Sequence, residues 1–341
     1  MKAVVFRKFG DVDTLQYTDF PDPEVRPGQV IVRVKACALN HLDIWQRKGL
    51  PGVTLPHIAG ADVSGIVADA GSGAGDLKKG DEVIVSPGIS CMKCGQCLAG
   101  DDNQCSHYDI LGYRNHGGYA EFVSVPEVNV LPKPGHLSFE EAASVPLVFL
   151  TAWHMLVGRA GVRPGDSVLV QAGGSGVGIA AIQIAKLFGA QVITTVGSDD
   201  KIEKAKALGA DNVINYRKQD FEEEVKILTG KRGVDIIIDH IGPEVWEKSV
   251  RSLAKNGRLV TCGSTSGPSV SFDLRYVFSR HLALLGSYMG RKAELLEVLK
   301  FVESGRLRPV VHKVFDLKDA AGAQREMLER KNFGKIVLKA G

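Results

Sequence analysis

The 341-residue sequence lacks the features that mark membrane, secreted and nucleic-acid-binding proteins. No apolar run reaches the length of about 18 residues that a membrane-spanning helix needs. The N-terminal segment MKAVVFRKFGD has neither the apolar core nor the small-residue cleavage site of a signal peptide. The net charge is only +3, and lysine and arginine are scattered rather than gathered in a basic stripe with aromatic residues. We therefore expect a cytoplasmic protein whose partners include no membrane and no nucleic acid.

Cysteine is scarce except in one short segment. The sequence has 6 cysteines, of which four form a tight cluster: Cys91, Cys94, Cys97 and Cys105. A disulfide framework would spread its cysteines along a short secreted chain, so this cluster is more typical of metal ligands. Four thiolates complete a tetrahedral zinc shell and leave no open position for chemistry, which predicts a structural zinc. The alternatives are free thiols or an iron–sulfur cluster, and nothing in the sequence indicates the electron-transfer partners that a cluster would need.

The length and the hydrophobic pattern predict two domains. Short β-rich runs punctuated by glycine and proline occupy the first 130 residues, at 3–6, 30–36, 63–68, 82–86 and 121–125. Residues 139–158 are apolar and alanine-rich, which predicts a helix. The last fifty residues return to a mixed pattern and end in a predicted strand at 335–339, so we expect the chain to return to the first module.

Strands and helices alternate between these two parts. The predicted strands are 167–171, 191–196, 213–215, 234–239, 258–261 and 282–286. The predicted helices are 177–188, 199–208, 220–228 and 245–254. Apolar β-branched strands that alternate with helices are typical of a parallel sheet covered on both faces, so the fold class is α/β.

A glycine-rich turn links the first of these strands to its helix. In Ala172-Gly173-Gly174-Ser175-Gly176-Val177-Gly178, closely spaced glycines let the backbone approach a pyrophosphate, and helix N-terminal amides bind its charge. Gly173 is expected to make the tight turn, and Gly178 to allow close packing of helix on strand. The middle position of the dinucleotide-binding pattern is Ser175 rather than glycine. A plain strand–helix loop is the alternative.

The end of the second strand favours NADPH over NADH. NAD sites place a carboxylate there, on the ribose hydroxyls, whereas this strand ends at Gly197. Ser198 can donate a hydrogen bond to a 2′-phosphate, and Lys201 can supply charge. Tyr216 and Arg217, after the third strand, are placed to flank the same pocket. Asp199 and Asp200 argue against an NADPH site unless they serve as a helix cap and a first-turn acid. The alternative for Lys201 is a solvent-exposed helix residue with no role in cofactor binding.

These residues together resemble the medium-chain dehydrogenase/reductase superfamily over nearly the whole chain. The cysteine lobe is similar to that of the zinc alcohol dehydrogenase branch. The resemblance implies a Rossmann domain with a parallel sheet plus a GroES-like, β-rich catalytic domain. It assigns residues 1–150 to the GroES-like domain, with the zinc lobe at about 88–108, residues 151–288 to the Rossmann domain and 289–341 to the return. It also implies a homodimer or homotetramer, with edge strands near 279–287 pairing between subunits.

The resemblance breaks at the catalytic zinc, which in that branch has three protein ligands. The matching positions hold Asn40, Ala61 and Leu147, and Leu42 replaces the hydroxyl that relays the alcohol proton. Alanine and leucine offer no metal-binding atom. Asn40 and Asp43 instead look like the Asn-x-x-Asp segment of the quinone oxidoreductase branch, which uses NADPH and has no zinc at its reaction centre.

That second resemblance implies most of the site. The expected catalytic residues are Asn40, His41 and Asp43, with Asn40 donating to the developing oxygen anion, Asp43 orienting the Asn40 loop, and Tyr113 a lesser donor. A turn-capping role for Asn40 is the alternative. The expected cofactor-binding residues are Thr151, Gly173, Ser175, Gly176, Val177, Gly178, Gly197, Ser198, Lys201, Tyr216, Gly263 and Lys335.

Three functions follow from these observations. The first is an NADPH-dependent oxidoreductase that reduces a small quinone or activated alkene and has structural zinc only. The second is a zinc alcohol dehydrogenase with a displaced metal site. Its ligands would come from Cys37, Asn40, His41, Asp43, His57 and Asp62. The third is a non-catalytic NADPH-binding protein.

Overall fold

The computed structural model describes residues 1–73 and 75–341, and its chain divides into two compact units. Unit 1 comprises Met1–Leu147 and Arg291–Gly341, and unit 2 comprises Val148–Gly290. The division therefore falls after residue 147 and after residue 290, within three residues of the predicted limits at 150 and 288. No helix in the described part of the chain is long and apolar enough to cross a membrane.

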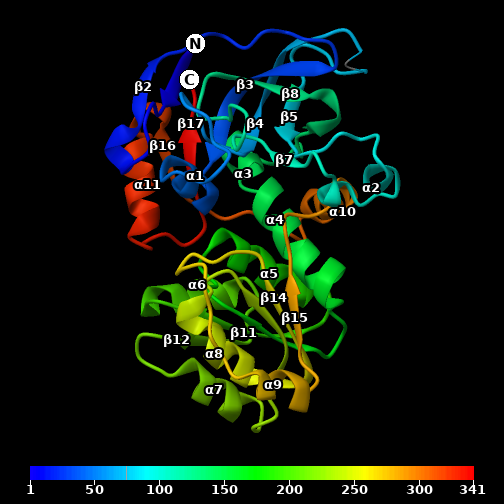
Figure 1. The fold of residues 1–341 in the computed structure, drawn as a ribbon, viewed down its shortest axis with the longest axis vertical. Coiled ribbons are helices and arrows are strands. Elements are labelled where there is room, and N and C mark those ends of the chain that lie inside the picture. The colour runs from blue at the N-terminus through cyan, green and yellow to red at the C-terminus, as the bar shows by residue number, and fades with distance from the viewer. Residues whose placement is uncertain (74) are drawn as a thin grey trace. The chain divides into compact units, whose positions relative to one another are not determined.

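Unit 2 is built on a six-stranded sheet (Figure 1). Its strands are β10 (Ser167–Val170), β11 (Gln191–Val196), β12 (Asn212–Asn215), β13 (Val234–Asp239), β14 (Leu253–Thr261) and β15 (Ala283–Gly286). All neighbours pair in parallel, in the order β12-β11-β10-β13-β14-β15. This is the strand order of a Rossmann sheet, and its carboxyl ends share one edge.

Helices connect the strands of unit 2. They are α5 (Gly176–Leu187), α6 (Ile202–Ala207), α7 (Phe221–Leu228), α8 (Pro243–Ser252) and α9 (Leu274–Ser279), with a 3₁₀ turn η5 (Asp199–Lys201) before α6. Strand β10 is buried at every residue, as expected for a parallel strand covered on both faces. The core packs Leu169, Ile193, Ile237 and Leu259 against Val225 and Val250 of the helices.

The segment before this sheet differs from its prediction. A continuous helix over 139–158 is wrong: the structure has α3 (Phe139–Ala143), α4 (Pro146–Trp153) and a π-helical turn η4 (His154–Ala160). Proline lacks a backbone N–H and is well tolerated in the first turn of a helix, so Pro146 begins a new helix instead of continuing α3. Similarly, β14 begins at Leu253, inside the predicted helix 245–254.

Unit 1 is mainly β. Its seven-stranded sheet runs β16-β17-β3-β4-β5-β9, with β8 beside β3. The strands are β3 (Gln29–Ala38), β4 (Asp62–Ala70), β5 (Glu82–Val85), β8 (Phe122–Pro126), β9 (Val130–Pro132), β16 (Val311–Asp316) and β17 (Lys335–Lys339). Unit 1 also has two separate two-stranded sheets, which pair β1 (Lys2–Val5) with β2 (Gln16–Asp19) and β6 (Gly88–Ile89) with β7 (Asp109–Ile110).

The helical elements of unit 1 are short apart from two near the C-terminus. Besides α3, they are α1 (His41–Arg47), α2 (Gly95–Leu98), α10 (Lys292–Glu303) and α11 (Ala320–Leu328), with 3₁₀ turns η1 (Val12–Thr14), η2 (Asp102–Gln104), η3 (Glu127–Asn129) and η6 (Leu317–Asp319). The sheet and α11 enclose one apolar core that includes Val32, Val63, Val123, Ile336 and Met327.

The register of three strands positions the candidate site in unit 1. Ala38, the last residue of β3, lies opposite Asp62 at the start of β4 and opposite Val337 of β17. The backbone N–H of Leu39 donates to Ile336 O at 2.9 Å. The C-terminal strand therefore brings Lys335 to the point where β3 leads into Asn40 and α1.

Candidate functional site

The glycine-rich turn of unit 2 lies at the carboxyl end of β10, where α5 begins. Ser175 is the N-cap of α5, and its Oγ accepts a hydrogen bond from Gly178 N at 2.9 Å. A Cβ on Gly178 would lie 2.3 Å from Ala172 O, and one on Gly173 would lie 2.2 Å from Thr194 Oγ1. Neither position has room for a side chain, so the backbone makes a tight turn between β10 and α5. Helix α5 has twelve residues, and the amides at its N-terminus can bind a phosphate.

The residue that makes the turn is not the one expected. Ala172 has a φ of 52°, in the left-handed region, whereas Gly173 does not have a positive φ. Glycine is required at position 173 because a side chain there would clash with Thr194. Ala172, rather than Gly173, adopts the left-handed conformation, which is unfavourable for a residue with a Cβ.

His240 joins this turn, and sequence reasoning missed it. Its Nε2 lies 3.0 Å from Ser175 Oγ. The signal was available, because β10 and β13 are parallel neighbours whose carboxyl ends must meet. The preceding residue, Asp239, is fully buried and accepts hydrogen bonds from Ile241 N and Gly242 N, at 2.7 and 3.2 Å. Burial raises the pKa of Asp239 to about 6.

The structure brings together the residues predicted for the 2′-phosphate. Tyr216 lies against Gly197, because a Cβ on Gly197 would be 2.6 Å from Tyr216 Oη. Burial lowers the pKa of Lys201, and the positive charge of nearby Arg217 lowers it further. A phosphate would oppose this lowering of the Lys201 pKa, because it adds negative charge beside the two cations.

The two acids that argued against NADPH have other partners. Asp199 accepts from Asn215 Nδ2 at 2.7 Å and pairs with Lys218. Asp200 accepts a hydrogen bond from Ser198, which lowers the pKa of that carboxyl. Ser198 is the N-cap residue of η5 without a side-chain cap bond.

The other predicted cofactor residues of unit 2 lie in defined elements. Gly176 and Val177 open α5. Thr151 is a buried residue of α4. Gly263 follows β14, and its carbonyl accepts from Thr261 Oγ1 at 3.1 Å.

In unit 1 the amide of Asn40 is held from both ends. Its Oδ1 accepts from Lys335 Nζ at 2.7 Å, and its Nδ2 donates to Asp62 Oδ2 at 3.0 Å. The second Nδ2 hydrogen has only a 3.4 Å contact with Ala38 O. Asn40 is 8% exposed. Its side chain thus has a fixed orientation and one weakly held hydrogen.

Asp43 holds the backbone of the same residue. Asn40 N donates to Asp43 Oδ2 at 2.8 Å, so Asp43 orients the turn into α1. The same oxygen accepts from Tyr119 Oη at 2.9 Å. Both side chains are fully buried; burial raises the pKa of Asp43 to about 6 and raises the pKa of Tyr119 well above its usual value.

The two histidines considered in this region have different surroundings. His41 is the first residue of α1, and it keeps contact with solvent. Surrounding protein atoms lower the pKa of His41 to about 4, and the charges of Arg330 and Lys335 also lower it. His57 is buried, with Nε2 2.8 Å from Gly112 O. Tyr113 donates to Pro51 O at 2.7 Å.

The four sulfur atoms of the cysteine lobe have the spacing of a tetrahedral metal site. Its sulfur–sulfur distances are 3.5 Å for Cys94–Cys97 and for Cys91–Cys105, 3.8 Å for Cys94–Cys105 and 3.9 Å for Cys91–Cys97. Tetrahedral zinc with bonds of about 2.3 Å puts its sulfurs about 3.8 Å apart. The backbone amides of Cys91 and His107 also point at Cys105 Sγ, at 3.5 and 3.3 Å. The four residues fit a zinc ion.

No second metal group is found in residues 1–73 and 75–341. The four cysteines are the only cluster of three or more His, Cys, Asp or Glu residues there with ligand atoms close enough for one ion. The set proposed for a displaced metal, from Cys37 to Asp62, does not converge. Its carboxylates instead bind Asn40, Tyr119 and Lys335.

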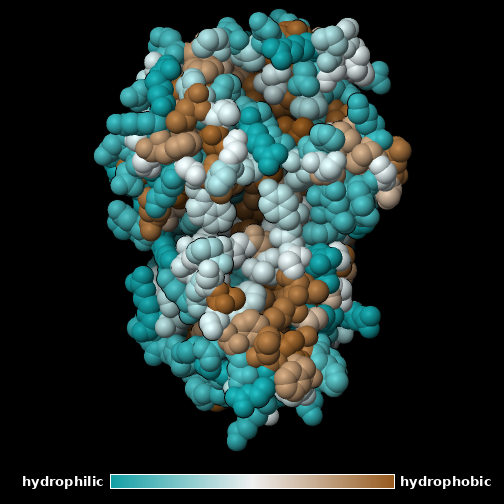
Figure 2. All heavy atoms as spheres, in the orientation of Figure 1, coloured by the Kyte–Doolittle hydropathy of each residue, from teal (hydrophilic) through white to brown (hydrophobic). Residues whose placement is uncertain are grey.

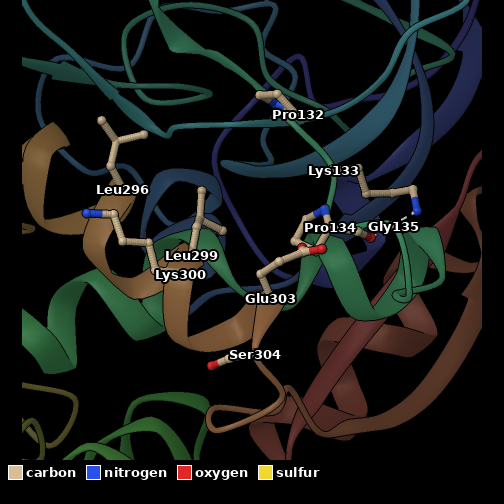
Figure 3. A pocket seen from close by; sticks show the side chains of 9 residues that line it. All are labelled: Pro132, Lys133, Pro134, Gly135, Leu296, Leu299, Lys300, Glu303 and Ser304. Carbon is tan, nitrogen blue, oxygen red and sulfur yellow. Dashed lines mark hydrogen bonds between the residues drawn. The ribbon is translucent and has the colours of Figure 1, made fainter.

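A groove of about 670 Å³ lies elsewhere on unit 1, between the loop after β9 and α10 (Figure 3). It is lined by Pro132, Lys133, Pro134, Gly135, Leu296, Leu299, Lys300, Glu303 and Ser304. None of these is a predicted site residue.

Comparison with known proteins agrees with this architecture. Residues 26–135 match the alcohol dehydrogenase GroES-like domain, and residues 176–304 match the zinc-binding dehydrogenase domain. The chain is 34% identical to an NAD-dependent alcohol dehydrogenase of Sulfolobus acidocaldarius, with 99% of each chain covered. It is 30% identical to a crotonyl-CoA reductase of Streptomyces avermitilis, over 96% of this chain and 82% of that one.

Among solved structures, one described as an NAD-dependent alcohol dehydrogenase is 52% identical, covers 100% of both chains and has a TM-score of 0.97. The relatives are named dehydrogenases and reductases, and the chain has both domains of such enzymes. The chain belongs to the medium-chain dehydrogenase/reductase superfamily and is an oxidoreductase enzyme.

Proposed function

We propose that this enzyme reduces a quinone or an activated alkene with NADPH, and that its only zinc is structural. The observation that carries the proposal is the set of side chains at the three positions where zinc-dependent relatives have ligands. They are the amide of Asn40, the methyl group of Ala61 and the aliphatic chain of Leu147. Because these groups do not form a zinc site, an unactivated alcohol would lack the Lewis acid that its oxidation needs. An acceptor that is already electron-poor needs less help.

The cofactor supplies a hydride to the electrophilic carbon of the acceptor. The protein binds it through the turn of Gly173, Ser175 and Gly178, where the α5 amides meet a pyrophosphate. In unit 1, hydride addition places negative charge on an oxygen of the acceptor. The weakly held Nδ2 hydrogen of Asn40 is the donor we assign to that oxygen. Lys335 and Asp62 hold the amide in place, so donation costs no reorganisation at the moment of reaction.

Preference for NADPH is supported by charge. Arg217 lies close enough to Lys201 for its positive charge to lower the pKa of Lys201. Asp199 forms an ion pair with Lys218, which neutralises its negative charge. With no carboxylate at Gly197, the end of β11 suits a 2′-phosphate.

One named relative supports an activated alkene. Crotonyl-CoA is an α,β-unsaturated thioester and therefore contains an electron-poor alkene, and the crotonyl-CoA reductase is 30% identical over 96% of this chain. An alcohol dehydrogenase is the second candidate, favoured by the description of the structure that is 52% identical. That candidate requires a second zinc, as well as alcohol oxidation that a chelator abolishes before the protein unfolds.

We also propose a homodimer formed through unit 2. Strand β15 lies at the end of its sheet, bonded to β14. Leu274 and Phe278 of α9 are 66% and 69% exposed, and Tyr288 is 55% exposed. Figure 2 shows apolar atoms gathered in this part of unit 2. An open edge beside exposed apolar side chains suits pairing with a second copy. Light scattering of the wild type and of Phe278→Glu tests this, with the variant expected to be monomeric.

The test of the proposed reaction is steady-state turnover on matched substrates. We expect NADPH oxidation with a quinone or an enone, and expect the rate to survive incubation with EDTA. Alcohol oxidation that is faster than enone reduction, and that is lost with EDTA while the protein stays folded, would contradict the proposal. Tight NADPH binding without turnover of any of these substrates would instead favour a non-catalytic role.

A further inference from the structure

Ser175 is the residue at which the glycine-rich turn departs from the dinucleotide-binding pattern. That pattern has a glycine at this position, because the backbone must come close to the pyrophosphate. Serine adds a side chain there, and the structure shows where this side chain goes. Its Oγ accepts a hydrogen bond from Gly178 N at 2.9 Å and lies 3.0 Å from His240 Nε2. The hydroxyl group is therefore held by two partners, one in α5 and one directly after β13.

The backbone around His240 is fixed on both sides. The carbonyl oxygen of His240 accepts from Thr265 N at 3.4 Å and from Thr265 Oγ1 at 3.3 Å. The buried carboxylate of Asp239 accepts from two backbone amides of the turn that follows, at 2.7 and 3.2 Å. Strands β10 and β13 are parallel neighbours, so this turn meets the carboxyl end of β10, where Ser175 lies. The contact between His240 and Ser175 is thus set by the sheet and its loops.

The hydrogen atoms of this contact can be arranged in two ways. A serine hydroxyl has one hydrogen to donate and two lone pairs that accept, and one lone pair already accepts from Gly178 N. If His240 Nε2 carries no hydrogen, the hydroxyl donates to Nε2 and has nothing left for a ligand. If Nε2 carries a hydrogen, it donates to the second lone pair of Ser175 Oγ, and the hydroxyl hydrogen points elsewhere. Only the second arrangement lets Ser175 donate to a phosphate.

We propose that His240 is a positioning residue for the cofactor, which donates from Nε2 to Ser175 Oγ and thereby directs the serine hydroxyl at the pyrophosphate. The side chain that replaces the glycine then becomes a donor to the bound anion. Cofactor binding favours this arrangement, because a phosphate oxygen accepts the hydroxyl hydrogen in a charge-assisted hydrogen bond. The bond from His240 also polarises the hydroxyl and makes it a stronger donor. This inference rests on the proposed placement of the pyrophosphate at the turn, but not on the substrate.

A double-mutant cycle on cofactor affinity tests the coupling between the two residues. NADPH and NADH are titrated by fluorescence against Ser175→Ala, His240→Phe and the double variant. Ser175→Ala should raise the dissociation constant by about 10- to 100-fold, because one hydrogen bond to a charged group is lost. His240→Phe should raise it by about 3- to 10-fold, because the hydroxyl loses its orientation and its polarisation. In the Ser175→Ala background, His240→Phe should have no further effect.

Both cofactors should be affected by the same factors, because they share the pyrophosphate. His136→Phe is the matched control, because His136 is an exposed histidine of unit 1. Equal losses from His240→Phe with and without the Ser175 hydroxyl, or no loss with the hydroxyl present, would overturn the role of His240. Unchanged affinity for both cofactors in Ser175→Ala would overturn the placement of the pyrophosphate as well.

The conservative variant His240→Gln separates positioning from folding. The amide nitrogen of glutamine can donate to Ser175 Oγ as Nε2 does, so this variant should recover most of the affinity that His240→Phe loses. An affinity as low as that of His240→Phe, in a variant with the melting temperature of the wild type, would contradict the proposal.

Nitrogen-15 NMR of the imidazole rings locates the hydrogen directly, because a protonated ring nitrogen and a bare one differ widely in chemical shift. The signals of His240 are those that His240→Gln lacks. We expect Nε2 of His240 to carry a hydrogen in the complex with NADPH. A bare Nε2 in that complex would refute the arrangement, whatever the substrate of the enzyme.

Discussion

Replacing Asp43 by asparagine should remove a pH dependence from the stability of unit 1. Asp43 is fully buried, and its pKa rises from 3.8 to about 6 because burial disfavours the carboxylate. At 1.36 kcal/mol for each pKa unit, a rise of about two units corresponds to about 3 kcal/mol. Because the folded pKa is the higher one, this stabilisation is complete below pH 3.8 and is lost as the pH rises through about 6.

Asparagine cannot ionise, yet its oxygen can accept the same two hydrogen bonds from Asn40 N and Tyr119 Oη. Chemical unfolding of the wild type and of Asp43→Asn between pH 4 and pH 8 is the assay. The difference in unfolding free energy should shift in favour of the variant by up to about 3 kcal/mol across this range. Asp319→Asn, at an exposed carboxylate of unit 1, should shift nothing. Parallel pH profiles for wild type and Asp43→Asn would show that the buried carboxyl does not titrate in this range and would contradict a raised pKa for Asp43.

Three further predictions concern the cofactor and the lobe. Lys201→Ala should raise the KM for NADPH by about 10- to 100-fold, because that factor corresponds to the loss of one charged hydrogen bond. The KM for NADH should stay nearly unchanged. Lys204→Ala is the control. Gly178→Ala places a Cβ 2.3 Å from Ala172 O and should abolish NADPH binding in a fluorescence titration, whereas Gly135→Ala, with open space around it, should not. Cys97→Ser should release zinc and lower the melting temperature without altering the dissociation constant for NADPH, and a weakened dissociation constant would contradict a purely structural lobe.

The regular elements of unit 2 were predictable because a parallel sheet buries both faces of its strands. Strands β11 and β13 begin and end at the predicted residues, since their β-branched runs are bounded by glycine or by polar residues. Strand β17 was predicted equally well. The helix over 139–158 failed because its apolar composition outweighed the single break signal, Pro146.

The site was predictable only where it is local in sequence. The glycine-rich turn and the four cysteines each lie within one short segment, and their spacing carries the chemistry. The left-handed residue was assigned to Gly173 instead of Ala172, because composition favours glycine for such a turn. The contacts of Lys335 with Asn40 and Asp62 were not predicted, since they depend on strands distant in sequence pairing in one register.

We propose that zinc binds this enzyme at the cysteine lobe alone. Zinc per subunit, measured by mass spectrometry on protein loaded with zinc and then desalted, tests it most directly. We expect one zinc in the wild type and none in Cys97→Ser. Two zinc ions in the wild type, with one retained in Cys97→Ser, would contradict it.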